Sequence, residues 1–113
     1  MKTARNFALV LVTVPNVAVA RRLARGILQE HLAACVNIVP RLESHYWWQD
    51  KLERSAELLL LIKTRRRLLK ALEQLVLKLH PYDTPEFLVI PVVDGSDDYL
   101  AWVETAVGPR KES

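Results

Sequence analysis

The chain has 113 residues, half of them hydrophobic and 26% charged, which is typical of one globular domain. We therefore predict a single domain over residues 1–113 with its core at about 7–107. The net charge of +3 is too small to identify a nucleic-acid or membrane binder. The only cysteine, Cys35, excludes an internal disulfide and favours a reducing, cytoplasmic location. No run approaches the ~20 apolar residues of a membrane span, so no membrane partner is expected.

Residues 7–14 are apolar at nearly every position, which predicts a strand buried on both faces in the middle of a sheet. The run also imitates a secretory leader, because basic residues precede it and small residues follow it. Pro15 and Asn16 are typical of a strand-to-helix turn, so we expect the run to be kept as a strand. Asn16 can then cap a helix over residues 17–33 that packs through one apolar stripe.

Residues 35–48 and 52–62 predict two strands joined near 49–51, with Pro40 interrupting the first. An arm of about 14 residues at ~3.3 Å each spans roughly 45 Å, whereas a globule of this size is about 35 Å across. The hairpin must therefore protrude or bend. A protruding hairpin is marginal alone in water, so we expect it to contact another subunit.

The remaining elements are a helix, a strand and a short closing helix. A helix is predicted over residues 65–79 with Thr64 as its cap. A strand over 87–93 contains Pro91, which argues for an edge position, and a helix over 97–107 closes the domain. Only residues 1–6 and 108–113 look like loose ends.

This order of elements predicts an α+β fold, the ferredoxin-like βαββαβ sandwich, with a long hairpin between its second and third strands and a short C-terminal helix. The topology puts the first and third strands in the centre of the sheet and the other two at its edges. The sequence agrees, because residues 7–14 and 58–62 are apolar on both faces and each expected edge strand contains a proline.

Five short motifs lie in register between Leu9 and Val107: Ala33-Ala34-Cys35-Val36-Asn37-Ile38, Ser44-His45-Tyr46-Trp47-Trp48, Ile62-Lys63-Thr64, His80-Pro81-Tyr82-Asp83-Thr84-Pro85-Glu86 and Tyr99-Leu100-Ala101-Trp102. Together they closely resemble the CutA family of divalent-cation tolerance proteins. The resemblance implies a tight homotrimer whose long hairpins extend the sheets across subunit boundaries. One departure is Asp50, at a turn position where the family usually has glycine. Asp tolerates left-handed geometry better than most residues, so we expect the turn to be kept.

Three side chains are the candidate metal ligands: Cys35, His80 and Glu86. Thiolate, imidazole and carboxylate suit copper(II) or zinc(II), and metal tolerance gives the family its name, so a divalent cation, copper above all, is the expected ligand. The spacing is not that of a zinc finger or zincin, and one cysteine cannot build a thiolate cage. The alternative is structural: His80 and Glu86 bond to turn backbone, and Cys35 packs in the core or at an interface.

Glu57, Lys63 and Tyr82 are the candidates for a cleft or an anion site. Glu57 and Lys63 flank the apolar run 58–62, where a central strand emerges from the core. Lys63 beside the predicted helix start at Thr64 suits an anion, because free backbone N–H groups and the helix dipole favour negative charge there. The alternatives are a Lys63–Glu57 ion pair and a solvated face for the arginines at 65–67.

Four aromatic side chains are expected at the trimer interface: Tyr46, Trp47, Trp48 and Trp102. A base-stacking platform is the alternative, because RNA-recognition motifs share the predicted fold. Those motifs place aromatic and basic residues on the third strand, where this chain has Glu57 and an apolar run, so no nucleic-acid partner is expected.

The sequence carries no nucleophile elbow, glycine-rich phosphate loop or catalytic-triad spacing, so we expect no enzyme activity. The prediction is a cytoplasmic homotrimer of CutA type that responds to metal ions and binds a divalent cation near its subunit clefts. Two alternatives stay open. One is a PII-like signalling trimer that binds anionic small molecules, and the other is a stable trimeric scaffold for a protein partner.

Overall fold

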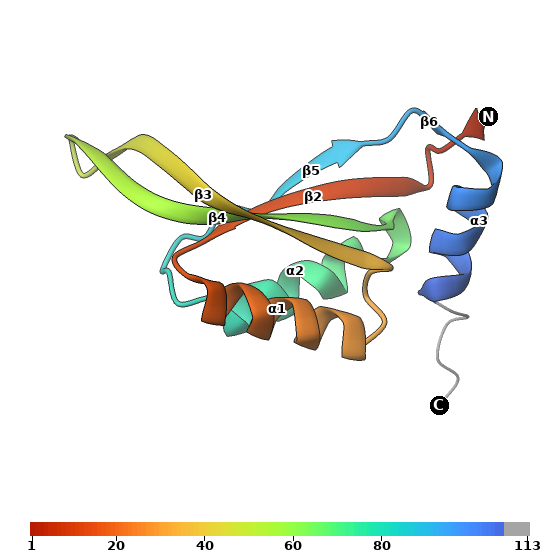
Figure 1. Ribbon diagram of the computed structural model, residues 1–113, viewed down its shortest axis with the longest axis horizontal. Coiled ribbons are helices and arrows are strands. Elements are labelled where there is room, and N and C mark those ends of the chain that lie inside the picture. The colour runs from red at the N-terminus through yellow and green to blue at the C-terminus, as the bar shows by residue number, and fades with distance from the viewer. Residues whose placement is uncertain (108–113) are drawn as a thin grey trace.

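Four antiparallel strands form the main sheet in the order β3-β4-β2-β5 (Figure 1), in a computed structural model that describes residues 1–107. The central strands are β2 (Phe7–Val14) and β4 (Lys51–Arg65). The edge strands are β3 (Cys35–Trp48) and β5 (Leu88–Pro91). The predicted α+β class and the central and edge position of every strand are confirmed.

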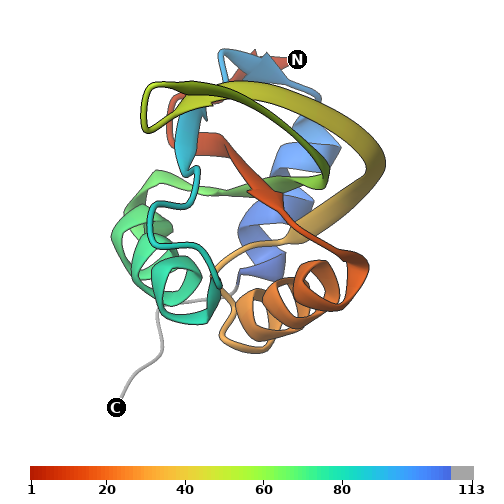
Figure 2. The same cartoon turned by 90° about the vertical axis from the view of Figure 1, so that its left-hand side faces the viewer.

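Two helices cover one face of this sheet (Figure 1). They are α1 (Val17–Gln29), which follows β2, and α2 (Leu69–Leu79), which follows β4 through the short 3-10 helix η1 (Arg66–Leu68). A third helix, α3 (Asp97–Ala106), lies beside a small two-stranded sheet made by β1 (Lys2–Thr3) and β6 (Asp94–Gly95). The helices α1 and α2 leave the opposite face of the main sheet without a helical cover, as Figure 2 also shows.

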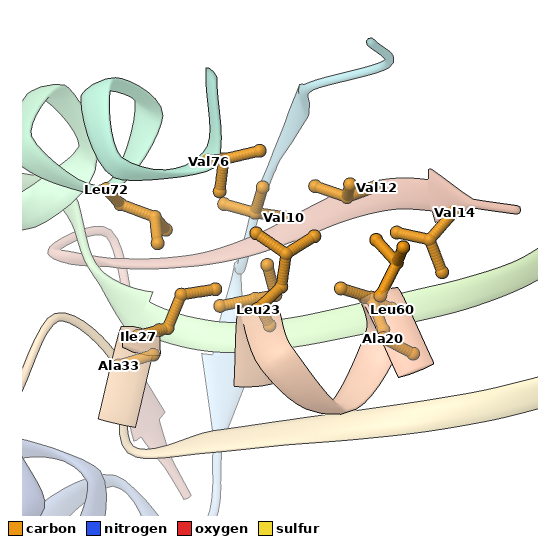
Figure 3. Close-up of a cluster of buried hydrophobic side chains, with 12 residues drawn as sticks. Val10, Val12, Val14, Ala20, Leu23, Ile27, Ala33, Leu60, Leu72 and Val76 are labelled. Carbon is orange, nitrogen blue, oxygen red and sulfur yellow. The ribbon is translucent and has the colours of Figure 1, made fainter. Parts of the chain in front are cut away.

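The core lies between the main sheet and α1 and α2 (Figure 3). Even-numbered residues of β2, and of β4 from Leu58 onward, point into it, because successive side chains of a strand alternate between faces. Val10 and Val12 are fully buried opposite Ile62 and Leu60. They meet an apolar stripe from the helices that includes Ala20, Leu23, Ile27, Leu72 and Val76. Each large aliphatic side chain buried in this way contributes roughly 1.5–3 kcal/mol, which fixes β2 in the middle of the sheet.

The odd-numbered residues of β2 and of the second half of β4, with their cross-strand partners in β3 and β5, form the opposite face of the sheet, which we call the open face. Phe7, at one end of this face, is buried in a cluster with Leu100 and Val103 of α3. The other apolar members of the face are partly or largely exposed: Leu9, Leu11, Val39, Leu59, Leu61, Leu88 and Ile90. Leu88 is 56% exposed and Ile90 is 41% exposed. The two faces of β2 are therefore apolar for different reasons. One face packs on α1 and α2, and the other, apart from Phe7, is not covered by any helix within residues 1–107.

The β3–β4 hairpin projects beyond α1 and α2 (Figure 1), as its length predicts. Its turn consists of Gln49 and Asp50, which both have positive φ, at 50° and 64°, as in a two-residue turn of type I′. Asp50 therefore keeps the turn in place of glycine. The pairing shifts register between Val39 and Leu42, and Arg41 has a φ of 63°, so the strand bends next to Pro40.

Two helix predictions need correction at their ends. Asn16 caps α1 as predicted, because its Oδ1 accepts a 2.9 Å hydrogen bond from the Val19 N–H, but the helix ends at Gln29 rather than 33. Thr64 is not a helix cap. It is a residue of β4, and its hydroxyl donates a 2.7 Å hydrogen bond to the Leu32 carbonyl. Pairing with β2 continues as far as Phe7–Arg65 and keeps this segment extended.

The prediction of a loose N-terminus is wrong, because these residues pair with a strand that the sequence did not predict. Lys2 and Thr3 pair with Gly95 and Asp94, and Ala4 is 1% exposed. Ala4 belongs to a second apolar cluster that contains Phe7, Leu100 and Val103. The predicted strand over 87–93 is shorter, Leu88–Pro91, and the predicted end 108–113 lies outside the described residues.

Candidate functional site

A pocket of about 540 Å³ lies where the hairpin meets the loop after α2. The hairpin supplies residues of β3 and also Glu57 of β4, β2 supplies Thr13, and the loop supplies residues between 82 and 86. The full lining is Thr13, Ser44, His45, Tyr46, Trp48, Glu57, Tyr82, Asp83, Thr84 and Glu86. We call this the hairpin pocket. It combines carboxylates with aromatic rings.

Glu57 is the most buried charged side chain of the hairpin pocket, at 7% exposure. The strand pattern of β4 turns it toward the open face, on the same side as Leu59 and Leu61. The Tyr82 hydroxyl donates a 2.9 Å hydrogen bond to Glu57 Oε2. Burial and this bond to a carboxylate raise the pKa of Tyr82 to about 12. Glu57 and Tyr82 are thus brought together in one pocket.

His80 stabilises the loop after α2 and does not line the hairpin pocket. It is 7% exposed, its Nε2 lies 2.8 Å from the Thr13 carbonyl oxygen, and its Nδ1 accepts a 3.1 Å hydrogen bond from the Tyr82 N–H. Because Nδ1 is an acceptor, the proton of the neutral ring is on Nε2, which donates to Thr13. Both ring nitrogens are therefore engaged, and the ring packs against Tyr82 with centroids 4.7 Å apart.

Glu86 completes the acidic side of the hairpin pocket. Burial raises its pKa above the ordinary value, and the negative charge of Glu57 raises it further. The negative charge of Glu57 therefore disfavours the ionised form of Glu86 across the pocket. Repulsion of this kind is relieved by a proton or by a bound cation, so the arrangement favours positively charged ligands.

The predicted interface aromatics separate into three places. Tyr46 and Trp48 line the hairpin pocket, whereas Trp47 alternates to the other side of β3, where it pairs with Leu52. Trp47 is 73% exposed and Leu52 is 67% exposed. Trp102 lies on α3 with its ring centroid 5.6 Å from that of Tyr99, and 47% of Trp102 is exposed.

Lys63 and Cys35 do not belong to the hairpin pocket. They face each other across the β3–β4 ladder, six residues from Glu57 along β4, which is about 20 Å of extended strand. The Lys63 ammonium donates to Asn37 Oδ1, so Lys63 makes no ion pair with Glu57. The predicted anion site also required a helix N-terminus at Thr64, but Thr64 is a residue of β4. Arg65 pairs with Glu104 at 2.7 Å.

The three predicted metal ligands are not brought together in one chain. Within residues 1–107, no three side chains of the His, Cys, Asp and Glu types form a group that could hold a metal ion. Cys35 is a half-buried residue of β3, His80 is committed to backbone partners, and Glu86 alone lines the hairpin pocket. Sequence reasoning did not name Thr13, Ser44 or Thr84 as site residues. Ser44 and Thr84 lie within the motifs shared with the family, whereas Thr13, near the end of β2, belongs to no motif.

The profile of the CutA1 divalent ion tolerance protein family matches residues 8–106. This chain belongs to the CutA family. The chain is 46% identical over 99 residues to the divalent-cation tolerance protein CutA of Thermus thermophilus, covering 88% of this chain and 96% of that protein. It is 50% identical over 97 residues to the chloroplastic protein CutA 1 of Oryza sativa, covering 86% of this chain but 55% of that protein. The chain thus spans about half the length of this plant relative.

A solved structure supports the same assignment. The chain aligns with the crystal structure of CutA1 from Oryza sativa at a TM-score of 0.89 and 45% identity, over 97% of this chain and all of that one. The CutA fold is therefore shown for this chain. None of the helices among residues 1–107 is long and apolar enough to cross a membrane.

Proposed function

We propose that this chain acts in divalent-cation tolerance as a homotrimer that binds a divalent cation at the hairpin pocket. The observation that carries the proposal is Glu57, a carboxylate buried to 7% exposure in a pocket that also holds Glu86. A buried charge is costly unless it is paired or coordinates a metal ion. A cation between the two carboxylates would supply that pairing.

The proposed ligand set differs from the one predicted from the sequence. Glu86 is retained, Glu57 joins it, and His80 becomes a positioning residue because both of its nitrogens bond to backbone. Copper(II) is the first cation to test, since it accepts oxygen and nitrogen ligands in tetragonal geometry. One subunit offers too few grouped ligands, so we propose that a neighbouring subunit completes the coordination.

The trimer is supported by uncovered apolar surface. The open face of the sheet and the Trp47–Leu52 pair expose large apolar side chains, and contiguous apolar surface of this kind marks protein interfaces. Both edge strands, β3 and β5, have one side free among the described residues for pairing with another chain. The subunit number of three rests on the family resemblance. Trp102 is a further candidate contact because it lies half exposed on α3.

Two other predictions stay as proposals. The cytoplasmic location rests on the lone Cys35, and the rice relative is named as chloroplastic. A binding role without catalysis rests on the missing catalytic motifs, and the family is described by tolerance rather than by a reaction. The PII-like alternative loses support, because the hairpin pocket is acidic and Lys63 lies outside it.

Native mass spectrometry of the full chain tests the proposal, first metal-free and then with stoichiometric copper(II). We expect a trimer that takes up three copper ions. Glu86→Gln and Glu57→Gln should each reduce that uptake, whereas Glu73→Gln, an exposed carboxylate of α2, should not. A monomer would overturn the assembly. Uptake that is equal in all three variants, or no uptake, would overturn the metal site.

A further inference from the structure

The hairpin pocket has two properties that a metal site does not need. It is far larger than an ion, at about 540 Å³, and three of its walls are the aromatic residues Tyr46, Trp48 and Tyr82. Pockets for small organic ligands have volumes of roughly 300–1,000 Å³ and are lined by aromatic rings with a few polar groups. The size and the walls therefore indicate a ligand that contains carbon.

The charges of the hairpin pocket indicate that this ligand is positive. Glu57, Asp83 and Glu86 contribute carboxyl groups. Among the described residues that line the pocket, only His45 can carry a positive charge, and it lies 2.7 Å from Glu43. The Tyr82 hydroxyl already donates its hydrogen bond to Glu57, so it is not a free donor for an anion. An anion would meet the negative charge of these carboxylates.

We propose that the hairpin pocket binds a small organic ammonium cation, with its nitrogen at Glu57 and Glu86 and its carbon atoms against the rings of Tyr46, Trp48 and Tyr82. Aromatic faces attract organic cations within about 6 Å of the ring centroid, because the ring face is electronegative. Carboxylates strengthen that attraction through charge-assisted hydrogen bonds when the ligand carries N–H groups.

The described residues favour an organic cation over a bare metal ion in an isolated subunit. A metal ion needs several donors within about 2.0–2.6 Å, and no group of three such side chains exists within residues 1–107. An ammonium ion needs one or two carboxylates and an apolar wall, and one subunit supplies both. The proposal shares the pocket with the proposed function, but it requires neither a bound metal nor the tolerance role.

The test is calorimetric titration of the metal-free full-length protein, in the presence of a chelator, with n-butylammonium and with n-butanol. The two probes share a chain and differ mainly in charge. We expect the ammonium to bind and the alcohol to bind at least about tenfold more weakly, since a charge-assisted hydrogen bond is replaced by a neutral one. Equal binding of the two probes, or no binding of the ammonium, would overturn the proposal.

Paired variants locate the bound cation. Glu57→Gln keeps an acceptor for the Tyr82 hydroxyl but removes the charge, and it should weaken n-butylammonium binding about tenfold or more. Glu73→Gln removes an exposed charge on α2 and should leave binding unchanged. Amide NMR signals of residues 82–86 should shift on binding. Equal effects of the two variants, or shifts confined to other segments, would contradict the assignment to the hairpin pocket.

The two proposals for the hairpin pocket can fail separately. Copper uptake without ammonium binding would overturn only the organic cation, and ammonium binding without copper uptake would overturn only the metal site. If both ligands bind, copper should displace n-butylammonium, because both require the charge of Glu57 and Glu86.

Discussion

The hydroxyl of Tyr82 donates a 2.9 Å hydrogen bond to the carboxylate of Glu57, and this bond ties the loop after α2 to the central strand β4. The two residues are 25 positions apart in the chain. His80 positions Tyr82 for this contact, because its Nδ1 accepts a hydrogen bond from the Tyr82 N–H while its Nε2 donates one to the Thr13 carbonyl. The result is a short chain of hydrogen bonds from β2 through the loop to β4, and it shapes the hairpin pocket.

Tyr82→Phe should lower the free energy of unfolding by about 1 kcal/mol, because it leaves the buried Glu57 carboxylate without its phenol donor. Tyr46→Phe is the matched control. It removes an exposed 3.2 Å bond between Tyr46 and Ser55 and should cost less. Urea unfolding of both variants measures the difference. Equal losses would mean that the bond to Glu57 contributes nothing beyond an exposed hydroxyl contact.

Alkaline titration should show one late-ionising tyrosine. The chain has three tyrosines, and burial together with Glu57 raises the pKa of Tyr82 from 10.0 to about 12. Between these two values the folded chain holds a proton that the unfolded chain has released, so stability falls as pH rises from 10.0 to about 12. The tyrosine absorbance change near pH 12 should disappear in Tyr82→Phe.

Glu57→Gln should move the Tyr82 ionisation to lower pH without restoring the ordinary pKa, because burial, the largest cause of the shift, remains. The same absorbance titration measures this. If the late ionisation is unchanged in Glu57→Gln, the carboxylate has no influence on the phenol.

Glu86→Gln should change how the free energy of unfolding depends on pH. The pKa of Glu86 is raised above its ordinary value of 4.5 by burial and by Glu57. Between pH 4.5 and the raised pKa, the folded chain keeps a proton that the unfolded chain has released. The free energy of unfolding therefore falls as pH rises through this interval. Replacing the carboxyl with an amide removes that loss.

The stability of Glu86→Gln relative to the wild type should therefore increase as pH rises from 4.5 through the raised pKa of Glu86. Thermal unfolding across this range checks the trend, with Glu73→Gln as a control for the loss of a carboxyl group on exposed surface. A constant difference between Glu86→Gln and the wild type would contradict a raised pKa.

Thr64→Val should destabilise the fold by about 1 kcal/mol, because the Thr64 hydroxyl is buried and donates a 2.7 Å bond to the Leu32 carbonyl. This bond fastens the loop after α1 to β4. Thr105→Val removes a similar hydroxyl-to-carbonyl bond on the exposed side of α3 and should cost less. Denaturant unfolding of the pair tests whether the role of Thr64 is tertiary rather than that of a helix cap.

Several features of the fold follow from local sequence. The run 7–14 predicts a central strand because it is apolar on both faces, and Asn16 predicts a helix start because its short side chain can reach the free N–H of Val19. Pro40 and Pro91 predict edge strands because proline lacks the ladder donor, and the pairing confirms both. Each of these depends on one residue or on a repeating pattern, so a single sequence carries the information.

The contents of the candidate site depend on tertiary structure instead. Glu57 and Lys63 flank the same apolar run, but an extended strand keeps them about 20 Å apart, and only Glu57 reaches the hairpin pocket. Cys35, His80 and Glu86 have suitable chemistry for one metal site, yet strand register and backbone hydrogen bonds keep them from grouping in one chain.

Sequence alone determined the family, the order of the elements and which strands are central, because apolar periodicity, prolines and short motifs are local properties of the chain. Only the tertiary structure decided that Thr64 continues a strand, that residues 2–4 join the fold, and that Glu57, Tyr82 and Glu86 face one pocket. These outcomes depend on pairing between residues far apart in the chain, and the register of that pairing is set by the packing of the whole sheet.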